Sequence, residues 1–136
     1  MRVSEVDPTA THDLRRRVLL DTWRDVVLSG DEVDGTFHLG VDDGGTLVAV
    51  ATFVPTDEGV QLRGMAVEPA VRGRGVGRLL VEAALERLRD AGVERLWCNA
   101  RDDAVPFYER LGFRVTGDGF VHAESGIPHH RMDRDV

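Results

Sequence analysis

Apolar residues along this chain recur at two spacings, and each spacing predicts one kind of secondary structure. Runs that alternate with polar residues, or that stay apolar over a short stretch, are typical of strands. The run ending at Val41 and the run starting at Leu47 are joined by Asp42-Asp43-Gly44-Gly45, a strong signal for a hairpin turn. The predicted strands span residues 2–6, 37–41, 47–53, 60–67, 93–98, 113–116 and 129–132.

Apolar residues that recur every three or four positions predict helices between these strands. Thr11 or Asp13 is expected to cap the first helix and Asp102 or Asp103 the third, because short polar side chains accept hydrogen bonds from free backbone N–H groups. A glycine follows each helix and ends it. This order of elements predicts an α/β fold in which helices cover a mixed sheet. The predicted helices span residues 11–30, 76–92 and 102–112.

Several side chains in these elements are expected to serve the fold alone. Trp23 and Trp97 fall in apolar patterns, which places them in the core. The run Arg15-Arg16-Arg17 on the first helix is interpreted as a solvated face. Cys98 is interpreted as a buried residue without a chemical role, because no Cys-His signature surrounds it.

Composition and charge narrow the class of protein. The 136 residues fit one domain, residues 1–136, and 42% hydrophobic with 30% charged residues is ordinary for a globular chain. A formal net charge of -7 argues against nucleic acid as a partner. A single cysteine rules out an intramolecular disulfide and a four-cysteine metal site, and no metal is expected. The chain shows no apolar signal core and no membrane-length apolar run, so the expected location is the cytoplasm.

The segment Arg72-Gly73-Arg74-Gly75-Val76-Gly77-Arg78 carries the clearest chemical signal. It lies where a strand ends and a strong helix begins, and glycines there let a ligand approach the backbone. The first turn of a helix offers unpaired N–H groups and a positive dipole end, which together bind phosphates. The lysine of a nucleotide-triphosphate loop is missing, and the dinucleotide pattern G-x-G-x-x-G is present only in a broken form. A plain tight connection is the alternative interpretation, but the interleaved arginines favour anion binding.

Three ordered motifs carry a resemblance to a known family. Met65-Ala66-Val67-x-Pro69, followed by Arg72-x-x-Gly75-x-Gly77, resembles the acyl-CoA motif of the GNAT superfamily of N-acetyltransferases. The segment from Ala104 to Phe113 (Ala-Val-Pro-Phe-Tyr-Glu-Arg-Leu-Gly-Phe) is similar to the second signature of that superfamily. Gly126-Ile127-Pro128-His129-x-x-Met132 resembles its small bacterial ElaA-like branch. The motifs cover the C-terminal half densely, whereas the N-terminal half agrees mainly in its order of elements.

The resemblance implies a GNAT fold, with a mostly antiparallel sheet whose strands splay apart between flanking helices. It implies transfer of an acetyl group from acetyl-CoA to a primary amine, which attacks the thioester directly. Tyr108 is the implied general acid, since a phenol suits protonation of a departing thiolate. The splayed strand pairs with the pantetheine arm, and one of its backbone N–H groups polarises the thioester carbonyl. The residues implied in acetyl-CoA binding are Met65, Ala66, Val67, Arg72, Gly73, Arg74, Gly75, Val76, Gly77, Arg78 and Arg101.

Two positions depart from the family pattern and leave the general base unassigned. Arg101 stands where many relatives carry an asparagine, and Asn99 stands roughly where some place a catalytic glutamate. Asn99 cannot accept the proton of the amine, so the expectation is that water removes it or that the amine arrives neutral. Asn99 and His129 are the candidates on the substrate side, while His122 and His130 are interpreted as structural or surface residues.

The acceptor and the partners stay open. A small-molecule amine, a protein N-terminus or a lysine all fit, and a homodimer is neither required nor excluded. Tyr108 as an interior aromatic tied to the backbone is the alternative to a catalytic tyrosine. At the level of the whole chain, the alternatives are a catalytically silent module that binds or senses acyl-CoA and an interaction domain whose loop binds nothing.

Overall fold

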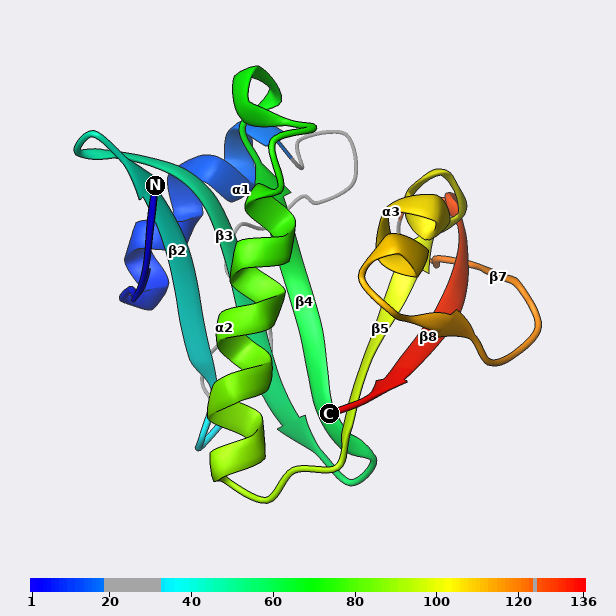
Figure 1. The fold of residues 1–136 in the computed structure, drawn as a ribbon. Helices are drawn as coiled ribbons and strands as arrows, with labels where there is room; N and C mark the ends of the chain where they lie inside the picture. Colours follow the sequence, from blue (N-terminus) through cyan, green and yellow to red (C-terminus); the bar gives the residue numbers. More distant parts are fainter. Residues whose placement is uncertain (19–32, 124) are drawn as a thin grey trace.

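The computed structural model describes residues 1–18, 33–123 and 125–136, and places them in an eight-stranded sheet with helices on both faces (Figure 1). Two short 3-10 turns, η1 (Pro8–Thr11) and η2 (Pro69–Val71), precede α1 and α2, and a third, η3 (Asp102–Ala104), precedes α3. The helices are α1 (His12–Val18), α2 (Val76–Asp90) and α3 (Val105–Arg110). The strands are β1 (Arg2–Glu5), β2 (Phe37–Asp43), β3 (Thr46–Thr56), β4 (Gly59–Val67), β5 (Arg95–Arg101), β6 (Arg114–Val115), β7 (Phe120–Val121) and β8 (Pro128–Asp135).

The strand order is β1-β2-β3-β4-β5-β8-β6, with β7 also paired to β8. Neighbouring strands are antiparallel except β4 and β5, which run parallel. That parallel pair is short: only Val60 with Leu96 and Gln61 with Trp97 are in register, and the strands then diverge (Figure 1). The mixed and mostly antiparallel sheet with splayed strands that the family resemblance implies is therefore confirmed.

Helices α1 and α2 cover opposite faces of β2, β3 and β4 (Figure 1). The long strand β3 is buried from Val48 to Val54, as expected for a strand with helices on both sides. Helix α2 buries a stripe of Leu80, Ala84 and Leu88 in the main core, at the three-to-four-residue spacing that predicted the helix. Leu14 of α1 packs in a smaller cluster on the other face.

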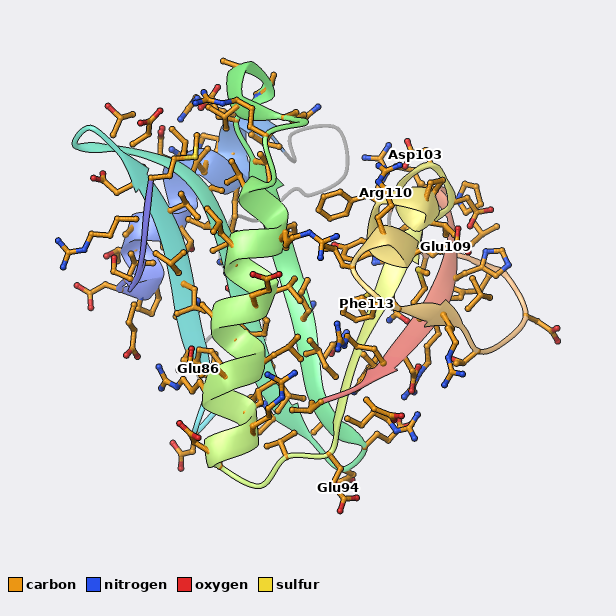
Figure 2. All side chains as sticks on the ribbon, in the orientation of Figure 1. Glu86, Glu94, Asp103, Glu109, Arg110 and Phe113 are labelled. Atoms are coloured by element: carbon orange, nitrogen blue, oxygen red, sulfur yellow. The ribbon has the colours of Figure 1, made fainter. Side chains whose placement is uncertain are left out.

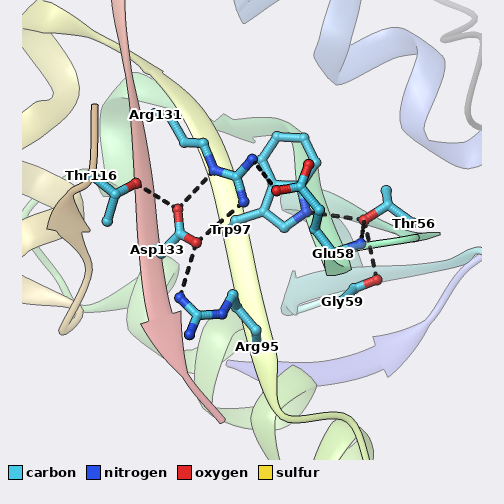
Figure 3. Close-up of polar contacts among 8 residues, drawn as sticks. All are labelled: Thr56, Glu58, Gly59, Arg95, Trp97, Thr116, Arg131 and Asp133. Atoms are coloured by element: carbon cyan, nitrogen blue, oxygen red, sulfur yellow. Dashed lines mark hydrogen bonds and ion pairs between the residues drawn. The ribbon is translucent and has the colours of Figure 1, made fainter. Parts of the chain in front are cut away.

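A buried carboxylate ties β8 to its neighbours (Figure 3). Asp133 accepts hydrogen bonds from Arg131 at 2.9 Å, from Arg95 of β5 at 3.2 Å and from Thr116 at 2.8 Å. The guanidinium of Arg131 also bonds to Glu58, in the turn between β3 and β4, at 2.7 Å. These contacts hold the β3–β4 turn against β5 and β8 at the end where β4 and β5 are still paired.

Several details of the predicted elements are wrong. Helix α3 begins at Val105 after Ala104 and has no side-chain cap; Asp102 instead bonds to His130, and Asp103 to Arg101. The strand β7 was not predicted, because two exposed residues carry no alternation. The helix predicted over 11–30 is described only as α1, and its part beyond Val18, with Trp23, lies outside the described residues.

Two predicted roles of side chains also change. Arg15 is 1% exposed, and its guanidinium donates to Thr52 of β3, so the arginine run is not a solvated face throughout. Trp97 is half-buried rather than central: its Nε1 donates to Thr56, and Arg131 lies over its ring at 4.2 Å. Among the described residues, none of the helices has both the length and the apolar character to cross a membrane.

Candidate active site

The candidate site lies in the wedge that opens where β4 leaves β5. Strand β4 carries a bulge there: the register with β3 passes from Ala66 opposite Val50 to Arg63 opposite Thr52, so Gly64 and Met65 together face one residue. Gly64 has φ +59°, a conformation that favours glycine at such a bulge. A bulge at the point where β4 and β5 diverge turns the backbone of β4 toward the wedge between the two strands.

A cleft of about 680 Å³ fills the upper part of this wedge, between the start of α2 and α3. Figure 2 shows Asp103 and Arg110 beside this opening, whereas Glu86 and Glu94 lie at the far end of the molecule. Nine of the eleven residues expected to bind acetyl-CoA line the cleft. The lining residues from that set are Met65, Val67, Arg72, Gly73, Gly75, Val76, Gly77, Arg78 and Arg101.

Two residues of the expected set do not line the cleft with their side chains. Ala66 is fully buried and packs with Leu14 and Val50 on the α1 side of the sheet, because alternate side chains of a strand point to opposite faces. Arg74 is exposed at the tip of the loop. Sequence reasoning missed Val71, Phe107, Arg110 and Leu111 as lining residues. The last three lie within the second signature, from which the resemblance implied a role for Tyr108 alone.

The glycines of the loop serve two different purposes. Gly73 and Gly75 have φ of +78° and +76°, and an added Cβ at either would meet nothing within 4 Å. Gly75 directly precedes α2, so the loop turns in a left-handed conformation and presents the first N–H groups of the helix to the cleft. At Gly77 a Cβ would lie 2.4 Å from the ring of Phe107, so this glycine permits close packing of α2 against α3.

The arginines around the loop are positioned by backbone carbonyl groups. Arg72 Nε donates to the carbonyl of Val67, at the end of β4, at 3.2 Å. Arg78 donates to the carbonyl of Arg110, at the end of α3, at 2.8 Å. Both guanidinium groups are exposed, and both line the cleft next to the start of α2. Positive charge therefore gathers at one end of the cleft, in a chain whose net charge is negative.

A second, smaller hollow of about 130 Å³ adjoins the cleft on the β8 side. Asn99, Ser125, His122 and His129 line it. The two hollows share four lining residues: Met65, Arg101, Ala104 and Tyr108. Asn99 and His129, the two residues expected on the substrate side, therefore come together in one hollow, and Arg101 stands between that hollow and the cleft.

Tyr108 lies where the two hollows meet. Its ring is held edge-on by Phe107 and Phe113, with centroids 5.0 and 5.5 Å away. Within the described part of the chain its hydroxyl has no hydrogen-bond partner, which goes against the interpretation of a phenol tied to the backbone. Burial, and to a smaller extent the neighbouring Cys98 thiol, raises the pKa of Tyr108 above its ordinary value near 10. The phenol therefore keeps its proton at neutral pH.

His129 and His130 point to opposite faces of β8, as neighbours in a strand do. His130 bonds through Nδ1 to Asp102 at 2.7 Å, away from the hollow. His129 is 8% exposed, and its Nδ1 lies 2.8 Å from the carbonyl oxygen of Ile127. No cluster of three or more potential metal ligands exists among the described side chains. Burial raises the pKa of Cys98 to about 12, which keeps the thiol protonated and unreactive.

A comparison with family models matches residues 5–113 to the acetyltransferase (GNAT) family. The chain belongs to this family. The uncharacterized N-acetyltransferase YitI of Bacillus subtilis (strain 168) is 31% identical over 129 residues, which cover 88% of this chain and 87% of YitI. The prediction of the family from the three motifs is therefore confirmed, and the chain is an N-acyltransferase of the GNAT family.

Solved structures show the same fold. The crystal structure of Escherichia coli ElaA superposes with a TM-score of 0.82 and 22% identity, over 98% of this chain and 99% of ElaA. An aminoglycoside 6'-N-acetyltransferase complexed with coenzyme A gives a TM-score of 0.81 and 19% identity, over 99% of this chain and 97% of that one. At this identity the likeness establishes the GNAT fold alone.

Proposed function

We propose that this GNAT protein transfers an acetyl group from acetyl-CoA to a primary amine, with Tyr108 as the general acid. The observation that carries the proposal is the junction of the two hollows at Tyr108: the larger is lined by the glycine loop and its arginines, and the smaller by Asn99 and His129. The neighbour complexed with coenzyme A supports the choice of donor. The acceptor class, a small-molecule amine or the amine of a protein N-terminus or lysine, is part of the proposal.

The cleft fits the donor in three respects. The open backbone at Gly73 and Gly75, with the first turn of α2, suits a pyrophosphate, and Arg72 and Arg78 add positive charge beside it. The edge of β4 beyond Gln61 has no strand beside it on the β5 side among the described residues, so it offers backbone groups to the pantetheine amides. The thioester then lies near the bulge at Gly64 and Met65, where a backbone N–H of β4 polarises its carbonyl.

Tyr108 supplies the proton that the departing sulfur needs. Its raised pKa keeps the phenol protonated before the reaction. Removal from water also raises the pKa of a thiol, as burial does for Cys98. The pKa values of the phenol, which gives the proton, and of the thiol, which receives it, are therefore raised together. Proton transfer from phenol to thiolate therefore stays feasible in the site.

The test is single-turnover kinetics of Tyr108→Phe, which keeps the ring and its packing but loses the hydroxyl. The rate of acetyl transfer should fall roughly 10- to 1000-fold, with the dissociation constant of acetyl-CoA nearly unchanged. Single turnovers are required because slow product release masks a change in the chemical step. A parent-like single-turnover rate in Tyr108→Phe contradicts the assignment of the acid.

The wider proposal is tested with the parent protein and an amine library of amino acids, polyamines, aminoglycosides and peptides with a free N-terminus. Release of the CoA thiol together with a mass increase of the amine by one acetyl group is the expected result. Binding of acetyl-CoA without turnover of any amine points instead to a silent sensing module. If calorimetry detects no binding of acetyl-CoA or CoA, both the acetyltransferase and the sensing module are excluded.

A further inference from the structure

The proposed reaction needs a group that removes a proton from the amine, and the structure brings one residue into position for it. His129 lies on β8 in register with Arg101 of β5, at the inner wall of the small hollow. It lines the same hollow as Tyr108, which the proposed function makes the proton donor. An incoming amine in this hollow meets His129 on one side and the junction with the cleft on the other.

The hydrogen bond of His129 fixes which ring nitrogen carries the hydrogen. A backbone carbonyl oxygen only accepts hydrogen bonds, so Nδ1 of His129, 2.8 Å from the oxygen of Ile127, must be the donor. In the neutral ring Nε2 then has a free lone pair, which is the form that a general base requires. The bond joins the second residue of β8 to Ile127, which directly precedes the strand, so the tautomer is fixed by the local backbone.

Two further rings contact the ring of His129. Phe120 of β7 stacks on it with centroids 5.7 Å apart and planes 22° apart. His122 lies at 5.4 Å and is tilted by 39°. The Nδ1 of His122 accepts from the backbone N–H of Ser125 at 3.3 Å, so His122 is itself oriented by the turn before β8. With two rings packed against it and its Nδ1 bound, His129 has a fixed direction for Nε2.

We propose that His129 is the general base of this site, accepting a proton from the acceptor amine at Nε2 while the carbonyl of Ile127 holds the ring. The inference rests on the proposed function, because it assigns a role within the same reaction. It replaces the expectation that water alone removes the proton. It also gives a reason for β7, the short strand that places Phe120 against the histidine.

Residues of this chain can donate and accept every proton that moves in the proposed step. An ammonium acceptor gives one proton to Nε2 of His129, and the neutral nitrogen forms a bond to the carbonyl carbon of the thioester. The carbon–sulfur bond breaks, and the sulfur takes the phenolic proton of Tyr108. The phenolate recovers a proton from the new amide nitrogen, and His129 releases its proton to solvent. One ammonium and one thioester thus yield one amide, one thiol and one free proton.

The groups that face His129 come from several elements. Arg101 of β5 is its register partner, Tyr108 of α3 lines the same hollow, and His122 lies against its ring. His130 and Asp102 lie on the other face of β8 and pair with each other. That pair offers a matched control one residue away.

The experiment compares His129→Gln with His130→Gln in the full-length protein, using two acceptors. The first is an alkylamine that is protonated at neutral pH, and the second is a weakly basic amine of the same shape that is neutral there. For the alkylamine, kcat/KM of His129→Gln should fall roughly 100- to 10,000-fold, and the neutral-range limb of the pH–rate profile should disappear. With the weakly basic amine, kcat/KM of His129→Gln should fall much less, because this amine needs no base. His130→Gln should have the same kcat/KM as the parent with both amines.

Four results overturn the assignment. An unchanged pH–rate profile in His129→Gln rules out the base, and an equal loss with both amines indicates a packing role. Nitrogen-15 NMR of the ring is a readout independent of turnover: a hydrogen on Nε2 in the free protein contradicts the tautomer. A parent protein that binds acetyl-CoA yet acetylates no amine refutes the proposed function, and the assignment falls with it. Turnover in the parent with an unaffected His129→Gln refutes the base alone.

Discussion

Gly77 shows how one residue links the packing of the helices to the shape of the cleft. The absence of a side chain at this position lets the ring of Phe107 lie against the first turn of α2. The same ring lines the cleft, so the wall that faces a ligand is also a contact between α2 and α3. The sequence predicted a glycine needed for phosphate approach, and the structure adds a packing reason that depends on a residue 30 positions away.

Gly77→Ala should therefore reduce both stability and CoA affinity. The new Cβ overlaps Phe107, and relief of such overpacking typically costs about 1–3 kcal/mol. Urea denaturation and calorimetry with CoA measure the two effects. Gly73→Ala is the control for stability alone: its Cβ meets no protein atom within 4 Å, and only its left-handed φ costs about 1–2 kcal/mol. If a second change, Phe107→Leu, fails to recover stability in Gly77→Ala, the contact is not the cause.

At the scale of single residues, sequence reasoning succeeded where a local rule acts and failed where a distant partner decides. The spacing of Leu14 and Val18 marks the buried side of α1, and Arg15 lies beside Leu14 on that side. Its burial depends on Thr52 of β3, which no local pattern reveals. Asp102 has the chemistry of a helix cap, yet its carboxylate forms a hydrogen bond with His130 of β8 instead. Neither partner was predictable before the strands were in register.

The elements around β8 depend on one carboxylate. Burial by itself raises the pKa of Asp133, but hydrogen bonds from Arg131, Thr116 and Arg95 outweigh it and hold the pKa below its ordinary value. A lowered pKa in the folded state means that the folded chain releases this proton more readily than the unfolded chain does. The stabilisation is complete above the ordinary aspartate value near 3.8 and is lost as pH falls through the lower folded value.

Asp133→Asn should lower the free energy of unfolding at neutral pH by about 1–3 kcal/mol, because the arginines lose a charged acceptor. The parent should lose stability below pH 4, and Asp133→Asn should lose less of it there. Chemical denaturation at a series of pH values measures this difference. Asp135→Asn serves as the control, since that carboxylate is exposed and lies 3.9 Å from Arg95. Equal effects of the two substitutions contradict the network as the source.

Across the whole molecule, the cleft joins two parts of the sheet that touch each other little. One wall comes from β4 and α2, the other from β5 and α3, and the strands between them are paired at two positions only. Family motifs in the sequence predicted the cleft, because phosphate binding depends on a contiguous loop. The small hollow was not predictable in the same way, since Met65, Tyr108 and His129 meet there from three different elements.

A ligand that bridges the two walls should stabilise the whole chain. Acetyl-CoA at 100 times its dissociation constant adds about 2.7 kcal/mol to the free energy of unfolding, which a thermal shift detects. Pantetheine lacks the pyrophosphate that Arg72, Arg78 and the start of α2 are proposed to bind, so it should need a far higher concentration. Equal shifts with acetyl-CoA and pantetheine at equal concentration contradict the loop as a phosphate site.

The separation of β4 from β5 also affects how readily the protein aggregates in solution. Strand edges without partners are where proteins join into aggregates, and sheets normally protect such edges with charge, proline or cover. Here the inner edge of β4 runs into an open cleft, and Arg72 bonds only the carbonyl of its last residue, Val67. We expect the protein stored without acetyl-CoA to precipitate sooner than the protein stored with it, because the proposed pairing of pantetheine with β4 covers this edge.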